Sequence, residues 1–235
     1  MSCILQIETS RRVCSVAVTQ DGSLLFEKAD EDVEPNCATR LGVFVDEAVS
    51  YADSHGIPFD AVAVSCGPGS YTGLRMGVSM AKGFCYGRSL RLIAVPTLEL
   101  LCVPFLLRYD DIAPDALLCP MIDARRMEVY AAIYDRALNV CRPAKAEVVE
   151  TASYDEYLER GDVYFIGEGA EKCEGVIKHP HAHFVPNMRA SAHYMGPLAE
   201  KAVAMQRFAD TAYFEPFYLK NYIAQKQKSP LAGLA

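Results

Sequence analysis

The first sixty residues alternate short apolar runs with one longer amphipathic stretch. The apolar runs 3–9, 13–19 and 23–27 are separated by polar turns, and the second turn contains Asp21-Gly22, a pair typical of hairpins. From 39 to 54, apolar residues recur at the three- and four-residue spacing of one helical face before a glycine and a proline end the run. This pattern predicts three strands followed by a helix.

A buried strand and a glycine-rich turn come next. Ala61–Val64 is continuously apolar, as in a strand covered on both faces, and residues 67–73 read Gly-Pro-Gly-Ser-Tyr-Thr-Gly. We expect a helix from this turn to about Tyr86, a strand over 90–95 and a further helix over 97–107. The predicted order of the first half is therefore β-β-β-α-β-α-β-α.

The pattern restarts after a polar, proline-containing stretch at 108–114. The second half predicts three strands at 116–122, 127–134 and 140–149. A short helix at 154–159, a strand at 163–166 and a long helix at 190–208 follow. We therefore predict an α/β protein of two tandem β-β-β-α-β-α domains, over residues 1–108 and 109–235, with the second domain abbreviated. Such a duplication is the architecture of the actin-like ATPase superfamily (ASKHA, ribonuclease H-like fold).

Composition narrows the class of function. The chain has 235 residues, 51% of them apolar, and 23 basic against 30 acidic residues give a formal charge of -7. It therefore has no general attraction for phosphate backbones, and an RNA contact needs a local basic patch or a partner. We expect a cytoplasmic protein without membrane spans, since no apolar stretch is long enough for one. The nine cysteines form no CxxC pair and are expected to be buried hydrophobes in a reducing compartment.

The glycine-rich turn has two interpretations. Backbone amides between a buried strand and a helix start favour anions, so the turn can serve as a phosphate cradle. However, no Gly-Lys-Ser/Thr closes it, and its G-x-G-x-x-x-G spacing differs from the dinucleotide pattern. Both a cradle and a structural turn remain open. The candidate nucleotide contacts are Glu8, Thr9, Gly67 and Gly69.

The helix after this turn carries two stripes. Small side chains recur every four residues at Gly73, Gly77, Ala81 and Cys85, and a larger apolar stripe runs beside them. One stripe can rest on the chain's own sheet while the other meets a neighbour, or both can be core.

Three histidines lie far down the chain, at His179, His181 and His183. The first and last have the i,i+4 spacing of a helical metal motif, but Pro180 lies between them and disfavours a helix. A polar surface loop is the better interpretation, and we predict no metal site.

Four segments together resemble the TsaB (YeaZ) family of tRNA threonylcarbamoyladenosine biosynthesis subunits. They are Ile7–Ser10, Gly67–Gly77, Ile122–Tyr130 and Pro216–Lys220, and the block Gly-Pro-Gly-Ser-Tyr-Thr-Gly is the most specific. The resemblance implies an actin-like fold and a non-catalytic scaffold or activator that forms a heterodimer with the paralogous subunit TsaD, joined by the ATPase TsaE. The complex threonylcarbamoylates adenosine 37 of tRNAs that read codons beginning with A, so this chain would meet tRNA only through the complex.

The resemblance also implies that the first-domain helices form the partner surface, which supports a homodimer when the partner is absent. The candidate interface residues on the two helices are Leu41, Val45, Gly73, Met76, Gly77, Met80, Ala81 and Phe84. No cofactor or metal is expected in the chain alone, and a nucleotide at the partner interface stays open.

The chain departs from the family pattern at its phosphate turns. Glu8 replaces the usual Asp, no glycine follows it, and the second turn, 123–126, also lacks glycine. Asn36-Cys37 stands where relatives often keep a histidine. These departures disfavour metal-nucleotide hydrolysis, so we predict that the chain is not an enzyme by itself. The rivals are a small ATPase or phosphotransferase that uses Glu8, Thr9 and the turn 67–73, and a metallopeptidase, for which no H-E-x-x-H pattern exists.

Overall fold

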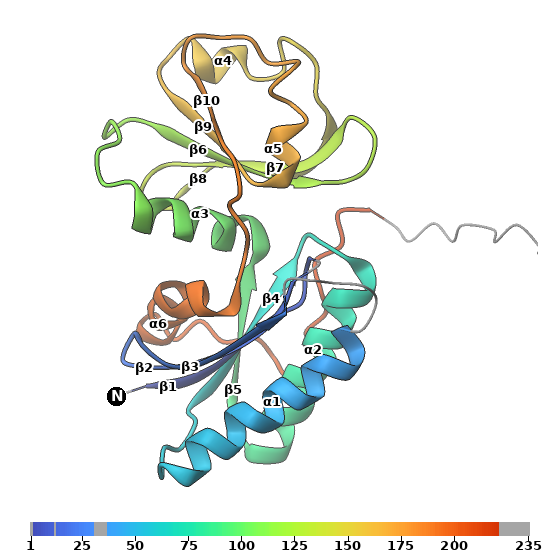
Figure 1. Ribbon diagram of the computed structural model, residues 1–235, viewed down its shortest axis with the longest axis vertical. Coiled ribbons are helices and arrows are strands. Elements are labelled where there is room, and N and C mark those ends of the chain that lie inside the picture. Colours follow the sequence, from blue (N-terminus) through green and yellow to red (C-terminus); the bar gives the residue numbers. More distant parts are fainter. Residues whose placement is uncertain (1, 12, 31–36, 221–235) are drawn as a thin grey trace, which may run out of the picture.

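Two five-stranded sheets of the same design make up the protein (Figure 1). The structure, a computed structural model, describes residues 2–11, 13–30 and 37–220. The strands of the first sheet are β1 (Cys3–Glu8), β2 (Cys14–Gln20), β3 (Ser23–Asp30), β4 (Ala61–Gly67) and β5 (Arg91–Pro96). They lie in the order β3-β2-β1-β4-β5, and β1 pairs antiparallel with β2 and parallel with β4.

The second sheet repeats this arrangement. Its strands are β6 (Leu117–Asp123), β7 (Glu128–Tyr134), β8 (Val140–Val148), β9 (Val163–Ile166) and β10 (Ala182–Val185). Their order β8-β7-β6-β9-β10 matches the first sheet strand for strand, since β6 pairs antiparallel with β7 and parallel with β9. The predicted α/β duplication is confirmed, because both sheets share one order and one set of directions.

The first half has the element order that the sequence predicts. The helices are α1 (Cys37–Ser54), α2 (Tyr71–Arg88), α3 (Thr97–Arg108), α4 (Asp155–Leu158), α5 (Glu168–Glu171), the 3-10 helix η1 (Ala192–Met195) and α6 (Gly196–Ala204). None of the helices in the described ranges combines the length and apolar composition that a membrane crossing requires. The long helix predicted over 190–208 is wrong. Pro197 has no amide hydrogen and fits only a first turn, so α6 begins beside it.

The strand β10 is a second departure from prediction. Its four residues are mostly half-buried and follow a segment rich in histidine and proline, so no alternating apolar pattern marks them. They pair in parallel with β9 at the edge of the second sheet. The predicted loop at 179–183 is therefore in part the start of a strand, and the second half is less abbreviated than expected.

Helices cover both faces of the first sheet. Leu5 and Ile7 of β1 pack in one apolar cluster with residues of α1 and α2, such as Phe44 and Val78. Ile4 points to the opposite face, where it joins a cluster formed with η1 and α6. This alternation follows from the two-residue period of a strand, and it buries β1 completely.

The helix α3 lies between the two sheets (Figure 1). Leu100 and Val103 face the first sheet, whereas Leu101 and Phe105 belong to the cluster of the second sheet. The helix α6 follows the second sheet in sequence but packs on the first, in the cluster of Ile4. A division after residue 108 therefore separates the two sheets in the sequence, but α3 and α6 both pack across that division.

The small-residue stripe of α2 faces inward. A Cβ at Gly73 would overlap the carbonyl oxygen of Thr9, and one at Gly77 would overlap the Thr9 hydroxyl. That hydroxyl donates a 2.7 Å hydrogen bond to the Gly73 carbonyl, and Ala81 is fully buried. Of the proposed interface residues, Gly73, Gly77 and Ala81 are thus internal packing positions, since only small side chains let α2 approach the end of β1.

We expect Gly77→Ala to lower the free energy of unfolding by about 1–3 kcal/mol, because the methyl group has no space beside Thr9. Gly83→Ala on the opposite face of the helix meets no atom within 4 Å and should raise it by about 1 kcal/mol or less, from helix propensity. Chemical denaturation of both variants measures the difference. Equal effects would show that the inward face of α2 tolerates added volume.

Candidate functional site

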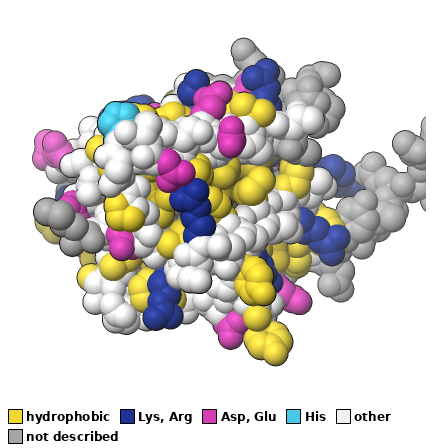
Figure 2. All heavy atoms as spheres, turned by 90° about the horizontal axis from the view of Figure 1, so that it is seen from below, with side chains coloured by type: hydrophobic (Ala, Val, Ile, Leu, Met, Phe, Trp, Pro, Cys, Tyr) yellow, Lys and Arg dark blue, Asp and Glu magenta, His cyan; other side chains and the backbone are white. Residues whose placement is uncertain are grey.

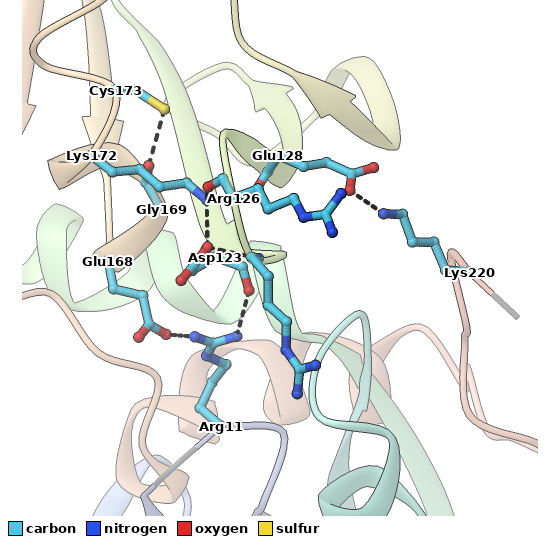
Figure 3. A network of polar contacts seen from close by, with 10 residues as sticks. Arg11, Asp123, Arg126, Glu128, Glu168, Gly169, Lys172, Cys173 and Lys220 are labelled. Atoms are coloured by element: carbon cyan, nitrogen blue, oxygen red, sulfur yellow. Dashed lines mark hydrogen bonds and ion pairs between the residues drawn. The ribbon is translucent and has the colours of Figure 1, made fainter. Parts of the chain in front are cut away.

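The cleft between the sheets brings the two candidate phosphate turns together. The turn after β1 and the turn between β6 and β7 both open toward it (Figure 3). A cavity of about 330 Å³ lies there, lined by residues of both halves that include Arg11, Thr97, Met121, Glu168 and Arg189. Its volume is at the lower end of the range for small-molecule sites.

Glu8 does not line this cavity as an exposed carboxylate. Its side chain is fully buried, and one carboxyl oxygen accepts hydrogen bonds from the backbone amide and the hydroxyl of Ser10. Burial raises the pKa of Glu8 and outweighs the lowering effect of these hydrogen bonds and of the Ser65 hydroxyl. Ionisation of this carboxyl group is therefore less favourable than in water.

The glycine-rich turn is filled by the chain itself. The Ser70 amide donates to the Ser10 carbonyl at 2.6 Å, and the Gly67 amide donates to the Thr97 hydroxyl at 3.2 Å. A Cβ at Gly69 would overlap Ser10, and one at Gly67 would overlap the carbonyl of Phe217. Gly67 also has a φ of +110°, which side chains rarely adopt.

The structure therefore brings the four candidate nucleotide contacts, Glu8, Thr9, Gly67 and Gly69, into one interlocked cluster. Phe217 closes it from outside, since its amide donates to the Cys66 carbonyl at 2.7 Å. In this arrangement the glycines give space to neighbouring backbone, which is the structural interpretation of the turn.

Arg11 spans the cleft between the two halves (Figure 3). Its guanidinium pairs with Glu168 of α5 and donates a 3.4 Å hydrogen bond to the carbonyl of Asp123 at the end of β6. A protein cation thus links the two turns across the cleft. Arg12, its neighbour in the sequence, and Asn36 lie outside the described residues.

The second turn is held by Lys172 (Figure 3). Its ammonium group pairs with Asp123 and donates to the carbonyls of Arg126 and Glu128 at 2.7 and 2.6 Å. Partial burial alone would raise the pKa of Asp123, but hydrogen bonds from Lys172 and the Arg125 amide lower it overall. Asp123 is therefore a structural anion of the turn. Among the described residues, no group of three or more His, Cys, Asp or Glu side chains is arranged to hold a metal.

The histidine segment lies away from the cleft, near the start of β9 and β10. His181 and His183 both contact one carboxylate oxygen of Asp162, at 2.8 and 2.9 Å. Hydrogen bonds from His183 and His181 lower the pKa of Asp162, and the His183 ring stacks on Tyr164. These contacts tie the edge strand to its neighbour.

The described cysteines are free thiols, and most are buried. Burial raises the pKa of Cys66 to about 12 and that of Cys85 to about 11, so they stay protonated near neutrality. The prediction of small buried hydrophobes holds for Cys85 and most of the other described cysteines, whereas Cys66 is of intermediate exposure. Cys141 is exposed.

The outer face of α2 carries an apolar groove of about 670 Å³. It is lined by Leu41, Met76, Ser79, Met80, Gly83, Phe84, Gly87 and Arg88. Seen from below, the first half shows hydrophobic side chains gathered in patches between isolated charges (Figure 2). Exposed apolar patches of this kind mark interaction surfaces in soluble proteins.

The groove divides the predicted interface residues. Met76, Met80 and Phe84 line it, as does Leu41, although Leu41 is only 2% exposed, whereas Val45 is buried in the core and does not line the groove. The small residues of this face are not among the predicted interface positions. Ser79, Gly83 and Gly87 recur every four residues, and a Cβ at either glycine meets no atom within 4 Å. The four-residue recurrence of these small residues is a signal in the sequence, and it lies on a different helical face from the stripe of Gly73, Gly77, Ala81 and Cys85.

Two turns facing a cleft between sheets of one strand order define the class of the protein, an α/β protein of actin-like fold. YeaZ from Pseudomonas aeruginosa superposes with a TM-score of 0.78 at 24% identity, covering 93% of this chain and 100% of that chain. An inorganic polyphosphate/ATP-glucomannokinase from Arthrobacter sp. shares the fold at a TM-score of 0.50 and 10% identity, covering 88% and 100% of the two chains.

Sequence comparison gives the family. Residues 31–226 match the family model described as TsaD: tRNA N6-adenosine threonylcarbamoyltransferase. The tRNA threonylcarbamoyladenosine biosynthesis protein TsaB of Escherichia coli is 28% identical over 95% of this chain and 97% of its own length. The Bacillus subtilis TsaB is 30% identical over 56% of this chain and 54% of its own length. The chain belongs to this family, on its TsaB (YeaZ) branch.

Glu8→Gln tests the buried carboxyl. The folded protein holds the proton of Glu8 more tightly than the unfolded chain, whose pKa is near 4.5. The ionisation of Glu8 therefore costs nothing below that pH and destabilises the fold increasingly as pH rises through the folded pKa. The glutamine can accept the Ser10 hydrogen bonds without ionising. We expect the variant to unfold at a higher temperature than wild type at pH 8, with a smaller difference at pH 4.

Thermal unfolding at several pH values measures this effect, with the exposed Glu174→Gln as the charge-matched control. A difference between Glu8→Gln and wild type that grows toward low pH would contradict the direction assigned to the pKa of Glu8.

Proposed function

We propose that this chain is a non-catalytic scaffold subunit in tRNA threonylcarbamoyladenosine biosynthesis. In this proposal it binds and positions a TsaD-type paralogue, which carries out threonylcarbamoyl transfer to adenosine 37 of tRNAs that read codons beginning with A, and a TsaE-type ATPase joins the complex. The biosynthetic role is supported by the TsaB relatives, one of which matches nearly the full length of the chain. The complex works in the cytoplasm, where tRNA is modified.

The outer groove of α2 is the observation that carries the partner-binding role. Gly83 and Gly87 leave the helix backbone open, so a partner helix can approach closely and gain many contacts. Met76, Met80 and Phe84 supply apolar area beside them, and methionine side chains adapt to the shape of a partner. A paralogue of the same fold presents a helix at the equivalent place, which favours a pseudo-symmetric pair of helices.

The same groove supports a homodimer when no paralogue is present. Two copies of α2 would then bury the same surface against each other, as in other twofold interfaces. The homodimer and the heterodimer would compete for one site.

The interlocked cleft supports the non-catalytic part of the proposal. The amides of Gly67 and Ser70 already have acceptors, Glu8 is buried, and Arg11 spans the space between the turns. A small ATPase or phosphotransferase of this fold would need these groups to turn toward a nucleotide. No arrangement of the described residues favours the metallopeptidase alternative.

We expect Gly83→Arg to weaken binding to the TsaD-type paralogue at least tenfold, since a long charged side chain would fill the floor of the groove. The change should leave the fold intact, because position 83 is open and arginine is a good helix former. Co-purification followed by calorimetric titration of the two subunits measures the effect.

The matched control is Gly175→Arg, an equally open glycine in the second half. It should bind the paralogue as wild type does. Wild-type affinity for Gly83→Arg would place the interface elsewhere, and failure of the wild-type chain itself to bind would remove the scaffold role.

A second measurement addresses catalysis directly. The isolated chain titrated with ATP and magnesium should give no binding heat, and it should not hydrolyse ATP or threonylcarbamoyl-adenylate, because the cleft groups are engaged with one another. Turnover that survives purification, and that is lost in Thr9→Val, would establish the chain as an enzyme in its own right.

A further inference from the structure

Two neighbouring arginines project from the turn between β6 and β7. Arg125 and Arg126 have φ angles of +71° and +52°, in the left-handed region that residues other than glycine rarely adopt. Both are exposed, and in the described part of the chain neither side chain forms an ion pair or a hydrogen bond. The turn is held in this conformation by the contacts of Lys172 to its backbone. Two guanidinium groups are therefore available to a ligand.

The carboxylates nearest to these arginines are already paired with other cations. Asp123 contacts Lys172, and Glu128 contacts Lys220 (Figure 3). The local charge at the turn is therefore positive, although the whole chain carries a formal charge of -7.

A cluster of two tilted tyrosine rings and one guanidinium group continues this surface onto the first half. The rings of Tyr71 and Tyr218 lie 4.7 Å apart between centroids, and the guanidinium of Arg75 lies 4.3 Å above the Tyr71 ring. Arg75 is exposed and forms no ion pair among the described residues. Tyr218 stands two residues before Lys220, a distance of about 7 Å at most along the chain, and Lys220 reaches Glu128 beside Arg126.

We infer that this strip, Tyr71, Arg75, Arg125, Arg126 and Tyr218, contacts RNA. Guanidinium groups pair with phosphate oxygens through two parallel hydrogen bonds, and an unstacked base can stack on an aromatic side chain. The combination of cations with aromatic rings favours RNA over an acidic protein segment, which would use the arginines alone. The inference rests on the proposed function, because that function brings an RNA to the complex, and it gives this subunit a direct contact with the substrate.

The test measures the affinity of an unmodified tRNA transcript for the complex of this chain with its TsaD-type paralogue, by fluorescence anisotropy at several salt concentrations. Arg125→Ala/Arg126→Ala should weaken binding and reduce the slope of log affinity against log salt by about 1.4 to 1.8, for two lost phosphate contacts. Tyr218→Ala should weaken binding about tenfold with little change of slope, whereas Tyr218→Phe should bind as wild type. The control, Arg160→Ala, removes an exposed arginine next to α4 and should have no effect.

Size-exclusion chromatography first confirms that each variant forms the complex. Assembled variants that bind RNA with wild-type affinity and slope would overturn the inference and leave the scaffold role intact. Arginine variants that lose the paralogue but not RNA would show that the strip holds an acidic protein surface, which also overturns it. If the wild-type chain does not assemble with the paralogue, the proposed function fails, and the same titrations on the isolated chain decide whether the strip binds RNA.

Discussion

The close approach of α2 to the end of β1 is the constraint on which the first half depends. Gly73 and Gly77 remove the side chains that would hold the helix away, and Thr9 fills the space with its carbonyl and its hydroxyl. Because the helix is held there, the glycine-rich turn before it closes on Ser10, and the tail at Phe217 closes on the turn. The opposite face of α2 is then directed outward with its groove. The position of α2 thus determines both the internal contacts around Thr9 and Ser10 and the outward direction of the groove.

The two sheets and the facing turns belong to a fold that includes kinases, but here the space between the turns is spanned by the pair of Arg11 and Glu168. A fold hosts chemistry only where its site leaves room for the ligand. In this chain the cleft holds a cavity of about 330 Å³, and the paired Arg11 and Glu168 both belong to its lining. The helix α3 contributes side chains to the apolar clusters of both sheets and so joins the two halves.

The sequence predicts most of the architecture because the strands next to the core are continuously apolar and the helices of the first half have clear periods. It fails at β10, since a half-buried edge strand of four residues has no pattern to detect. The nucleotide candidates illustrate a different limit. Spacing alone brings Glu8 and Gly67 to one end of the sheet, but only the structure reveals that the Gly67 amide already donates to the Thr97 hydroxyl and the Ser70 amide to the Ser10 carbonyl. Likewise, a helix with small residues on two faces does not reveal which face is inside until its partner strand is known.

The return of α6 to the first sheet has a consequence for how the protein is made. The strand β1 leaves the ribosome first, whereas the helix that covers its second face lies near the end of the chain. The first half cannot complete its core until the second half has been synthesised, so until then only α3, through Leu100 and Val103, covers the face around Ile4, Ala63 and Ile93. Domains usually fold in order from the N-terminus, but here folding of the first sheet waits for the last helix. Early termination would therefore leave an apolar sheet face partly uncovered, which marks truncated products for aggregation or degradation.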